Sequence, residues 1–157
     1  MTNQEINVFS RKISQATKSQ LVVIMYEIAI KYIDDGVAAL ENNDIDNYRL
    51  NLKRSKAVIN ELTSVLDMTH EISYELRRLY VFMTGVLVKA DIRKETEELL
   101  RVKEMLNKLA NSFKEVSKED GSGPIMENTQ TVYAGLTYSK DSLNENMYSD
   151  VNRGYKV

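Results

Sequence analysis

Apolar residues recur at alternating intervals of three and four along most of the chain before residue 118. The clearest series consists of Ile45, Tyr48, Leu52, Ser55, Ile59, Leu62 and Leu66. Two later series follow the same rule: Ile72, Leu76, Leu79, Met83, Val86 and Ala90, then Leu99, Val102, Leu106, Leu109, Phe113 and Val116. This spacing places the members of a series on one face of an α-helix, so each series predicts a helix that buries one face.

The first long helix has its own start and stop signals. Thr17 and Gln20 have the spacing of a capping box, in which each side chain bonds a free backbone N–H of the other residue. An apolar run follows at residues 21–26. The helix should reach about Leu40, because Asn42 and Asn43 tolerate the left-handed backbone that ends helices.

The later helices have similar boundary signals. Asp44 is suited to cap the second long helix. Residues 67–69 form a predicted turn in which Thr69 is a candidate cap. The fourth long helix is expected to start after Asp91.

Three apolar series and one mostly apolar helix, joined by short turns, predict an all-α protein. We expect an antiparallel four-helix bundle over residues 17–118. A short N-terminal arm, residues 1–16, precedes it. Residues 119–157 are expected to form a flexible, mostly non-helical C-terminal tail, because this part begins with a Gly-, Ser- and Pro-containing stretch and then shows no helical series.

The amino-acid composition argues against several classes of function. The net charge is −2 and no run of Lys and Arg is present, so nucleic acid is not an expected partner. The chain has no cysteine, which excludes thiolate catalysis and zinc–sulfur sites. The N-terminus lacks the pattern of a secretory signal, and the most apolar stretch, residues 21–33, contains Glu27 and Lys31. We therefore expect no membrane insertion and a cytoplasmic location.

Candidate chemistry is sparse. His70 is the only histidine, and a bundle di-iron site needs two Glu-x-x-His units, so we expect no metal, no cofactor and no catalytic residue. A histidine phosphotransfer bundle needs a single exposed histidine. His70 therefore keeps this enzyme class open as an alternative, although the neighbouring Glu71 would repel a phosphoryl group.

Two of the predicted helices have more apolar residues than one buried face requires. They lie at residues 17–40 and 72–90. Either these helices are the most central pair, or they leave an apolar groove for a partner. Val8 and Phe9 of the arm would then fold onto the empty groove. An oligomeric helical scaffold is a further alternative.

The sequence also resembles a known family. Residues 17–27 are similar to the first long helix of the flagellin-specific export chaperones, the FliS family, and residues 51–62 are similar to its second. Tyr80, Ala90 and the Phe113-Lys114 pair occur where the family has equivalent residues. Lys18 and Ile28 depart from the pattern, since proline and glycine are usual there. The resemblance covers about residues 7–117.

This resemblance implies a cytoplasmic protein that binds the C-terminal segment of flagellin, prevents premature polymerisation and delivers flagellin to the flagellar export apparatus. It brings no catalytic residue. The expected contacts are the arm and surface residues of the first three long helices, namely Ile6, Val8, Phe9, Tyr26, Tyr48 and Tyr80.

Overall fold

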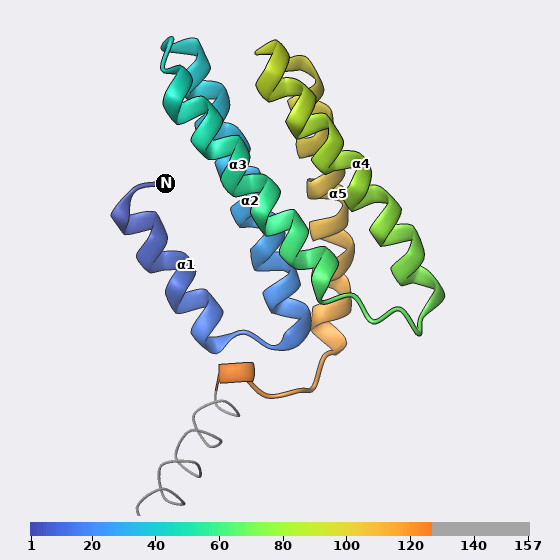
Figure 1. Cartoon of the computed structure of the whole chain (residues 1–157). Helices are drawn as coiled ribbons and strands as arrows, with labels where there is room; N and C mark the ends of the chain where they lie inside the picture. Colours follow the sequence, from blue (N-terminus) through green and yellow to red (C-terminus); the bar gives the residue numbers. More distant parts are fainter. Residues whose placement is uncertain (127–157) are drawn as a thin grey trace, which may run out of the picture.

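A computed structural model describes residues 1–126, and within these residues the chain forms five α-helices and no strand (Figure 1). The helices are α1 (Asn3–Gln15), α2 (Lys18–Glu41), α3 (Ile45–Ser64), α4 (Glu71–Arg93) and α5 (Glu97–Glu119). The all-helical class expected from the apolar series is confirmed. The prediction for residues 127–157 lies outside the described part.

Several predicted helix boundaries are confirmed by hydrogen bonds. The Thr17 hydroxyl accepts from the N–H of Gln20 at 3.3 Å, and the Gln20 side chain accepts from the N–H of Thr17 at 3.0 Å, which is the complete capping box. Asn43 has a φ of 58°, which is the left-handed conformation that closes α2. Asp44 then caps α3, since its carboxylate accepts from the N–H of Asn47 at 3.1 Å.

Two predicted boundaries around α4 are wrong. The residue that precedes α4 is His70, and the hydroxyl of Thr69 instead bonds the Asp67 carboxylate within the preceding turn. The break before α5 comes at Lys94, whose φ is 57°, and not at Asp91. Asp91 stays helical and lies 3.3 Å from Arg49 on α3.

The N-terminal arm is a helix with its own capping box. Thr2 and Glu5 exchange the two bonds that Thr17 and Gln20 exchange in α2. No residue of α1 is buried. A short helix without a fully buried residue depends on the surface beneath it for stability, because isolated helices of this length are marginal in water.

Helix α2 is the most central element. It packs against α3, α5 and α1, whereas α4 packs against α3 and α5. Figure 1 shows α2 and α4 running one way and α3 and α5 the other. A single core fills the space between them, and its largest fully buried side chains are Tyr26, Tyr48, Tyr80, Ile33, Ile59, Leu62, Met83, Leu87, Leu99 and Leu106.

The core contains polar groups that find partners on neighbouring helices. The hydroxyls of Tyr26 on α2 and Tyr80 on α4 bond each other. The Tyr48 hydroxyl donates to the carbonyl oxygen of Ala90 at 2.7 Å, and Ser55 donates to that of Ala29 at 3.0 Å. Because an unpaired buried hydroxyl is unfavourable, these bonds fix which helices lie side by side.

The segment after α5 returns to the joint between α1 and α2, as Figure 1 shows. The Asp120 carboxylate accepts bonds from the N–H and the hydroxyl of Ser19. The N–H of Ile125 donates to the carbonyl oxygen of Ala16 at 3.1 Å. These contacts hold the end of α5 beside the first turn of α2.

Candidate partner-binding surface

The outward face of α4 carries a second helical series, which we call the outer seam: Tyr74, Arg78, Val81, Gly85, Val88 and Ile92. It repeats at intervals of four and three, like the buried series of the same helix. Its apolar side chains are exposed, with 60% of Val81 and 74% of Ile92 accessible. Phe82 lies next to the seam and is half exposed. Contiguous exposed apolar residues on a soluble domain usually mark an interaction site.

An open groove of about 690 Å³ adjoins the outer seam on the α3 side. Its floor is apolar and includes Leu50, Leu87, Val88 and Ile92. Its α3 rim carries the basic residues Arg49, Lys53 and Lys56. Together with the outer seam, the groove forms an apolar strip with a basic edge.

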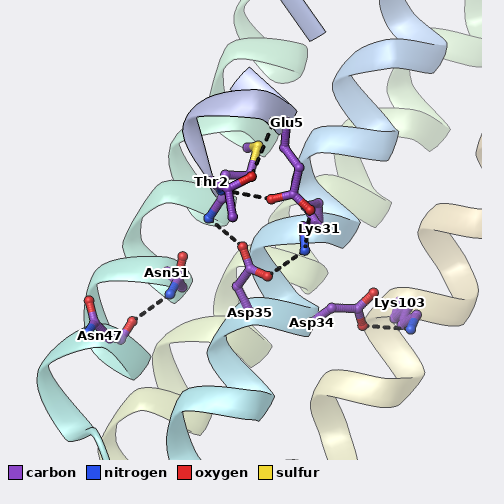
Figure 2. A network of polar contacts seen from close by, with 9 residues as sticks. Thr2, Glu5, Lys31, Asp34, Asp35, Asn47, Asn51 and Lys103 are labelled. Carbon is purple, nitrogen blue, oxygen red and sulfur yellow. Dashed lines mark hydrogen bonds and ion pairs between the residues drawn. The ribbon is translucent and has the colours of Figure 1, made fainter. Parts of the chain in front are cut away.

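Helix α1 is attached to α2 by ion pairs, several of which are visible in Figure 2. Glu5 lies 3.0 Å from Lys31, and Lys31 lies 2.7 Å from Asp35. The amino group of Met1 reaches the same Asp35 at 2.5 Å. At the other end of α1, Lys12 pairs with Glu27 at 3.0 Å. Partly exposed ion pairs each contribute little free energy, so α1 is held weakly.

The surface beneath the end of α1 is partly apolar. Val23 and Ile24 of α2 are buried, yet they are not part of the central core. They line a shallow depression together with Lys12 and Gln15 of α1. Departure of α1 would therefore uncover apolar surface on α2.

Glu27 connects α1 to two other helices. It pairs with Lys12 on α1 and with Lys114 on α5, the second at 3.2 Å. Burial alone would raise the pKa of Glu27, but the two ammonium groups outweigh burial and hold its pKa below the ordinary value. The charged carboxylate therefore favours the docked position of α1.

The expected contact residues fall into two groups. Ile6 and Val8 are exposed on α1, and Phe9 is half-buried beside Lys12, whose ammonium lies 5.4 Å from the ring centroid. In contrast, the expectation that the tyrosines lie on the surface is wrong, because all three are within 1% of complete burial: Tyr26, Tyr48 and Tyr80. Each reaches the core because its hydroxyl has a partner on another helix.

The structure brings forward residues that were not expected as contacts. Tyr74, Val81 and Ile92 are exposed on α4 and belong to the outer seam. A signal for them was present in the sequence, since they form a second series of the same period, displaced along the helix from the buried one.

No chemical centre accompanies this surface in the described part. His70 lies in an exposed turn, with its ring nitrogen 3.4 Å from Asp67. Residues 1–126 contain no group of three or more His, Asp or Glu side chains that could hold a metal ion. Among the same residues, no helix has both the length and the apolar character needed to cross a membrane.

Comparison with known proteins agrees with the resemblance seen in the sequence. The family model described as flagellar protein FliS matches residues 1–120. The flagellar secretion chaperone FliS of Bacillus subtilis (strain 168) is 27% identical over 118 residues, which cover 72% of this chain and 89% of that protein. The residues that the family model matches extend from α1 to the end of α5. The chain belongs to the FliS family.

Proposed function

We propose that this protein is an export chaperone of the bacterial cytoplasm that binds the C-terminal segment of flagellin, prevents its premature polymerisation and delivers it to the flagellar export apparatus. The family match and the name of the Bacillus relative support a chaperone role in flagellar secretion. A non-enzymatic role agrees with both.

The exposed apolar strip of α4 is the observation that carries this proposal. A monomeric domain gains nothing from keeping Val81 and Ile92 in water, whereas an amphipathic helix can bury its own apolar face against them. A disordered segment that folds on binding loses about 2–5 kcal/mol to ordering, and contact along a whole helix is large enough to offset this loss. The strip therefore suits a flexible client.

The architecture in this proposal is an antiparallel four-helix bundle of residues 17–118, formed by α2 to α5, with the arm of residues 1–16 on its side and the tail of residues 119–157 after it. Under this arrangement the three buried tyrosines support the binding surface from within, and they do not touch the client. Ile6, Val8 and Phe9 remain the proposed contacts on the arm.

In the same proposal, helix α1 covers part of the client-binding face of α2 and is displaced by the client. We call it the cover. It has no fully buried residue, forms ion pairs with α2, and borders Val23 and Ile24. A client segment with more apolar surface than α1 would displace it and occupy the same face of α2.

Co-purification with flagellin tests the proposed function. Intact flagellin should be captured in a one-to-one complex, and flagellin without its C-terminal segment should be lost. Retention of the complex without that segment would overturn the proposal. Sedimentation of the chaperone alone distinguishes it from a scaffold, since the proposal expects a monomer and a scaffold would give larger species.

Deletion of residues 1–16 tests whether α1 competes with the client. If α1 competes with the client, the deleted protein should bind the flagellin segment more tightly, whereas an arm that contributes net contacts would give weaker binding. An unchanged affinity counts against both roles. The paired substitution Ile6→Ser and Val8→Ser separates direct contact from competition, because it keeps the ion pairs and removes only exposed apolar side chains.

A further inference from the structure

The outer seam has the spacing of a coiled-coil contact. Its positions from Tyr74 to Ile92 alternate by four and three residues, which is the pattern of a helix that packs along another helix. The buried seam of α4 has this pattern because it packs against α3 and α5. The outer seam has the same pattern and no neighbour within residues 1–126. Its geometry therefore suits one further helix.

Gly85 lies at the middle of the outer seam. A Cβ atom at this position would meet no other atom within 4 Å, so nothing inside the described part of the chain requires a glycine there. A glycine inside a helix is unfavourable relative to alanine. Where two helices cross, however, it lets their backbones approach closely. Gly85 therefore marks the natural crossing point for the additional helix.

The charge around the outer seam indicates which kind of helix could bind there. The segment from residue 45 to residue 94 holds nine basic and six acidic side chains, so it is net positive within a chain whose total is −2. On the groove rim, Arg49 is already paired with Asp91 at 3.3 Å. Lys53 and Lys56 form no ion pair with any residue that the structure describes.

The first half of the seam is also basic. Arg78, a member of the seam, and Arg77, on its α3 side, line a second shallow depression with the exposed Tyr74, Val81 and Phe82. Arg78 is paired with Glu75 at 3.1 Å, whereas Arg77 has no ionic partner among residues 1–126. An apolar strip with a basic edge favours an occupant whose apolar stripe has an acidic edge.

We propose that the outer seam and the α3–α4 groove bind one amphipathic helix whose apolar stripe has acidic residues along the edge that faces α3 and which crosses α4 at Gly85. This proposal rests on the proposed function and deepens it, because it states the chemistry of the client segment that docks on α4. The central apolar contact supplies affinity, and Lys53, Lys56 and Arg77 select the charge of that edge.

Two designed peptides of about 20 residues test this proposal separately from the function. Both carry leucines at alternating spacings of four and three; one has glutamates and the other lysines on both flanks. The acidic peptide should bind about tenfold or more tightly than the basic one at low salt, as two or three exposed ion pairs allow. The preference should shrink at roughly 0.5 M salt, where the screening length is only a few ångströms.

Two variants locate the interaction. Lys53→Glu combined with Lys56→Glu should reverse the preference between the peptides, whereas the matched pair Arg101→Glu and Lys108→Glu on the outward face of α5 should leave it unchanged. Gly85→Leu should weaken both peptides, since its side chain stands at the crossing point. Circular dichroism checks that each variant stays folded.

The outcomes separate the two proposals. Equal binding of both peptides, no binding of the acidic peptide, or no effect of the Lys53 and Lys56 reversal would overturn the acidic-helix proposal even if intact flagellin is captured. If the flagellin C-terminal segment is not captured while the peptides behave as expected, the proposed function fails and the surface serves another acidic helical partner.

Discussion

Helices α2 and α4 have similarly apolar sequences but different surroundings. Helix α2 contacts α1, α3 and α5, and its large apolar residues are buried or half-buried. Helix α4 packs along α3 and α5 and touches α2 at Tyr80, and it leaves Tyr74, Val81, Phe82 and Ile92 exposed. The same surplus of apolar residues is therefore used inside the molecule in one helix and is available to a partner in the other.

The comparison shows that apolar excess alone does not identify a binding surface. Whether apolar residues stay exposed depends on how many helices pack along the helix, because each packed helix covers one apolar stripe. Helix α2 has three neighbours and needs three stripes, so its excess is structural. Helix α4 packs along two helices but has three apolar stripes, and the third stripe is the outer seam.

The largest expected difference between the two helices is in stability. Ile33→Ala in α2 removes a fully buried side chain and should lower the free energy of unfolding by about 2–5 kcal/mol. Val81→Ala in α4 should change it by no more than about 0.5 kcal/mol, because that side chain is exposed. Urea denaturation followed by circular dichroism measures both values, and similar losses would contradict the contrast.

Substitutions in α4 should affect client binding strongly, although they affect stability little. Val81→Asp combined with Val88→Asp puts two carboxylates in the strip and should weaken the flagellin C-terminal segment by about 2 kcal/mol or more, near thirtyfold. Isothermal titration calorimetry gives the affinity. Arg101→Asp combined with Lys108→Asp on α5 is the control, and it should leave affinity within about threefold. Equal losses in both pairs would mean that net charge, not the strip, controls binding.

The two helices also meet each other through Tyr26 and Tyr80. Burial, and then the hydrogen bond that its hydroxyl donates to Tyr80, raises the pKa of Tyr26 well above its ordinary value, so this hydroxyl stays protonated. Tyr26→Phe leaves the Tyr80 hydroxyl without its partner and should destabilise the fold by about 1–3 kcal/mol. The double variant with Tyr80→Phe should lose less than the two single losses added. Strict additivity in thermal unfolding would contradict a coupled pair.

Substitution of Gly85 should have a smaller effect on stability, and this effect should be stabilising. Gly85→Ala should raise the free energy of unfolding by about 0.5–1 kcal/mol, because alanine is favoured inside a helix and its Cβ meets nothing here. The same change should not strengthen binding of the flagellin segment. A gain in both stability and affinity would contradict the proposal that the client helix crosses α4 at Gly85.

The smallest expected effect concerns pH and α1. The pKa of Glu27 is lowered from its ordinary value of 4.5, so its contribution to α1 docking is present above about pH 4.5 and is lost as the pH falls through the lowered value. Because Lys12 and Glu27 are partly exposed, the effect should stay below about 1 kcal/mol. Amide exchange of residues 3–15, followed by NMR between pH 7 and pH 3.5, measures it. Glu27→Gln should flatten this dependence, and an unaltered profile would show that other groups control docking.

Much of the helical layout could be predicted because local signals dictate it. The capping box of Thr17 and Gln20, the cap at Asp44 and the closure at Asn43 depend on neighbours within a few residues. Helix α1 carries the same kind of signal at Thr2 and Glu5 but has few apolar residues, so its sequence predicts only an arm.

The candidate partner-binding surface is harder to predict because it depends on which helices are neighbours. Tyr26, Tyr48 and Tyr80 have polar ends that suggest a surface position, and only the pairing of α2 with α4 and of α3 with α4 gives their hydroxyls partners inside the core. Conversely, the exposed series of α4 and its buried series have the same period. Sequence spacing does not say which of the two faces inward.

Cross-linking from α4 tests the central claim most directly. A photoreactive amino acid placed at Val81 should form a covalent adduct with the flagellin C-terminal segment in the complex, whereas the same group at Lys108 on α5 should form none. Peptide mapping of the adduct then shows which client residues lie on the outer seam. Adducts from position 108 but not from position 81 would contradict the account, because the client would then be held away from the exposed face of α4.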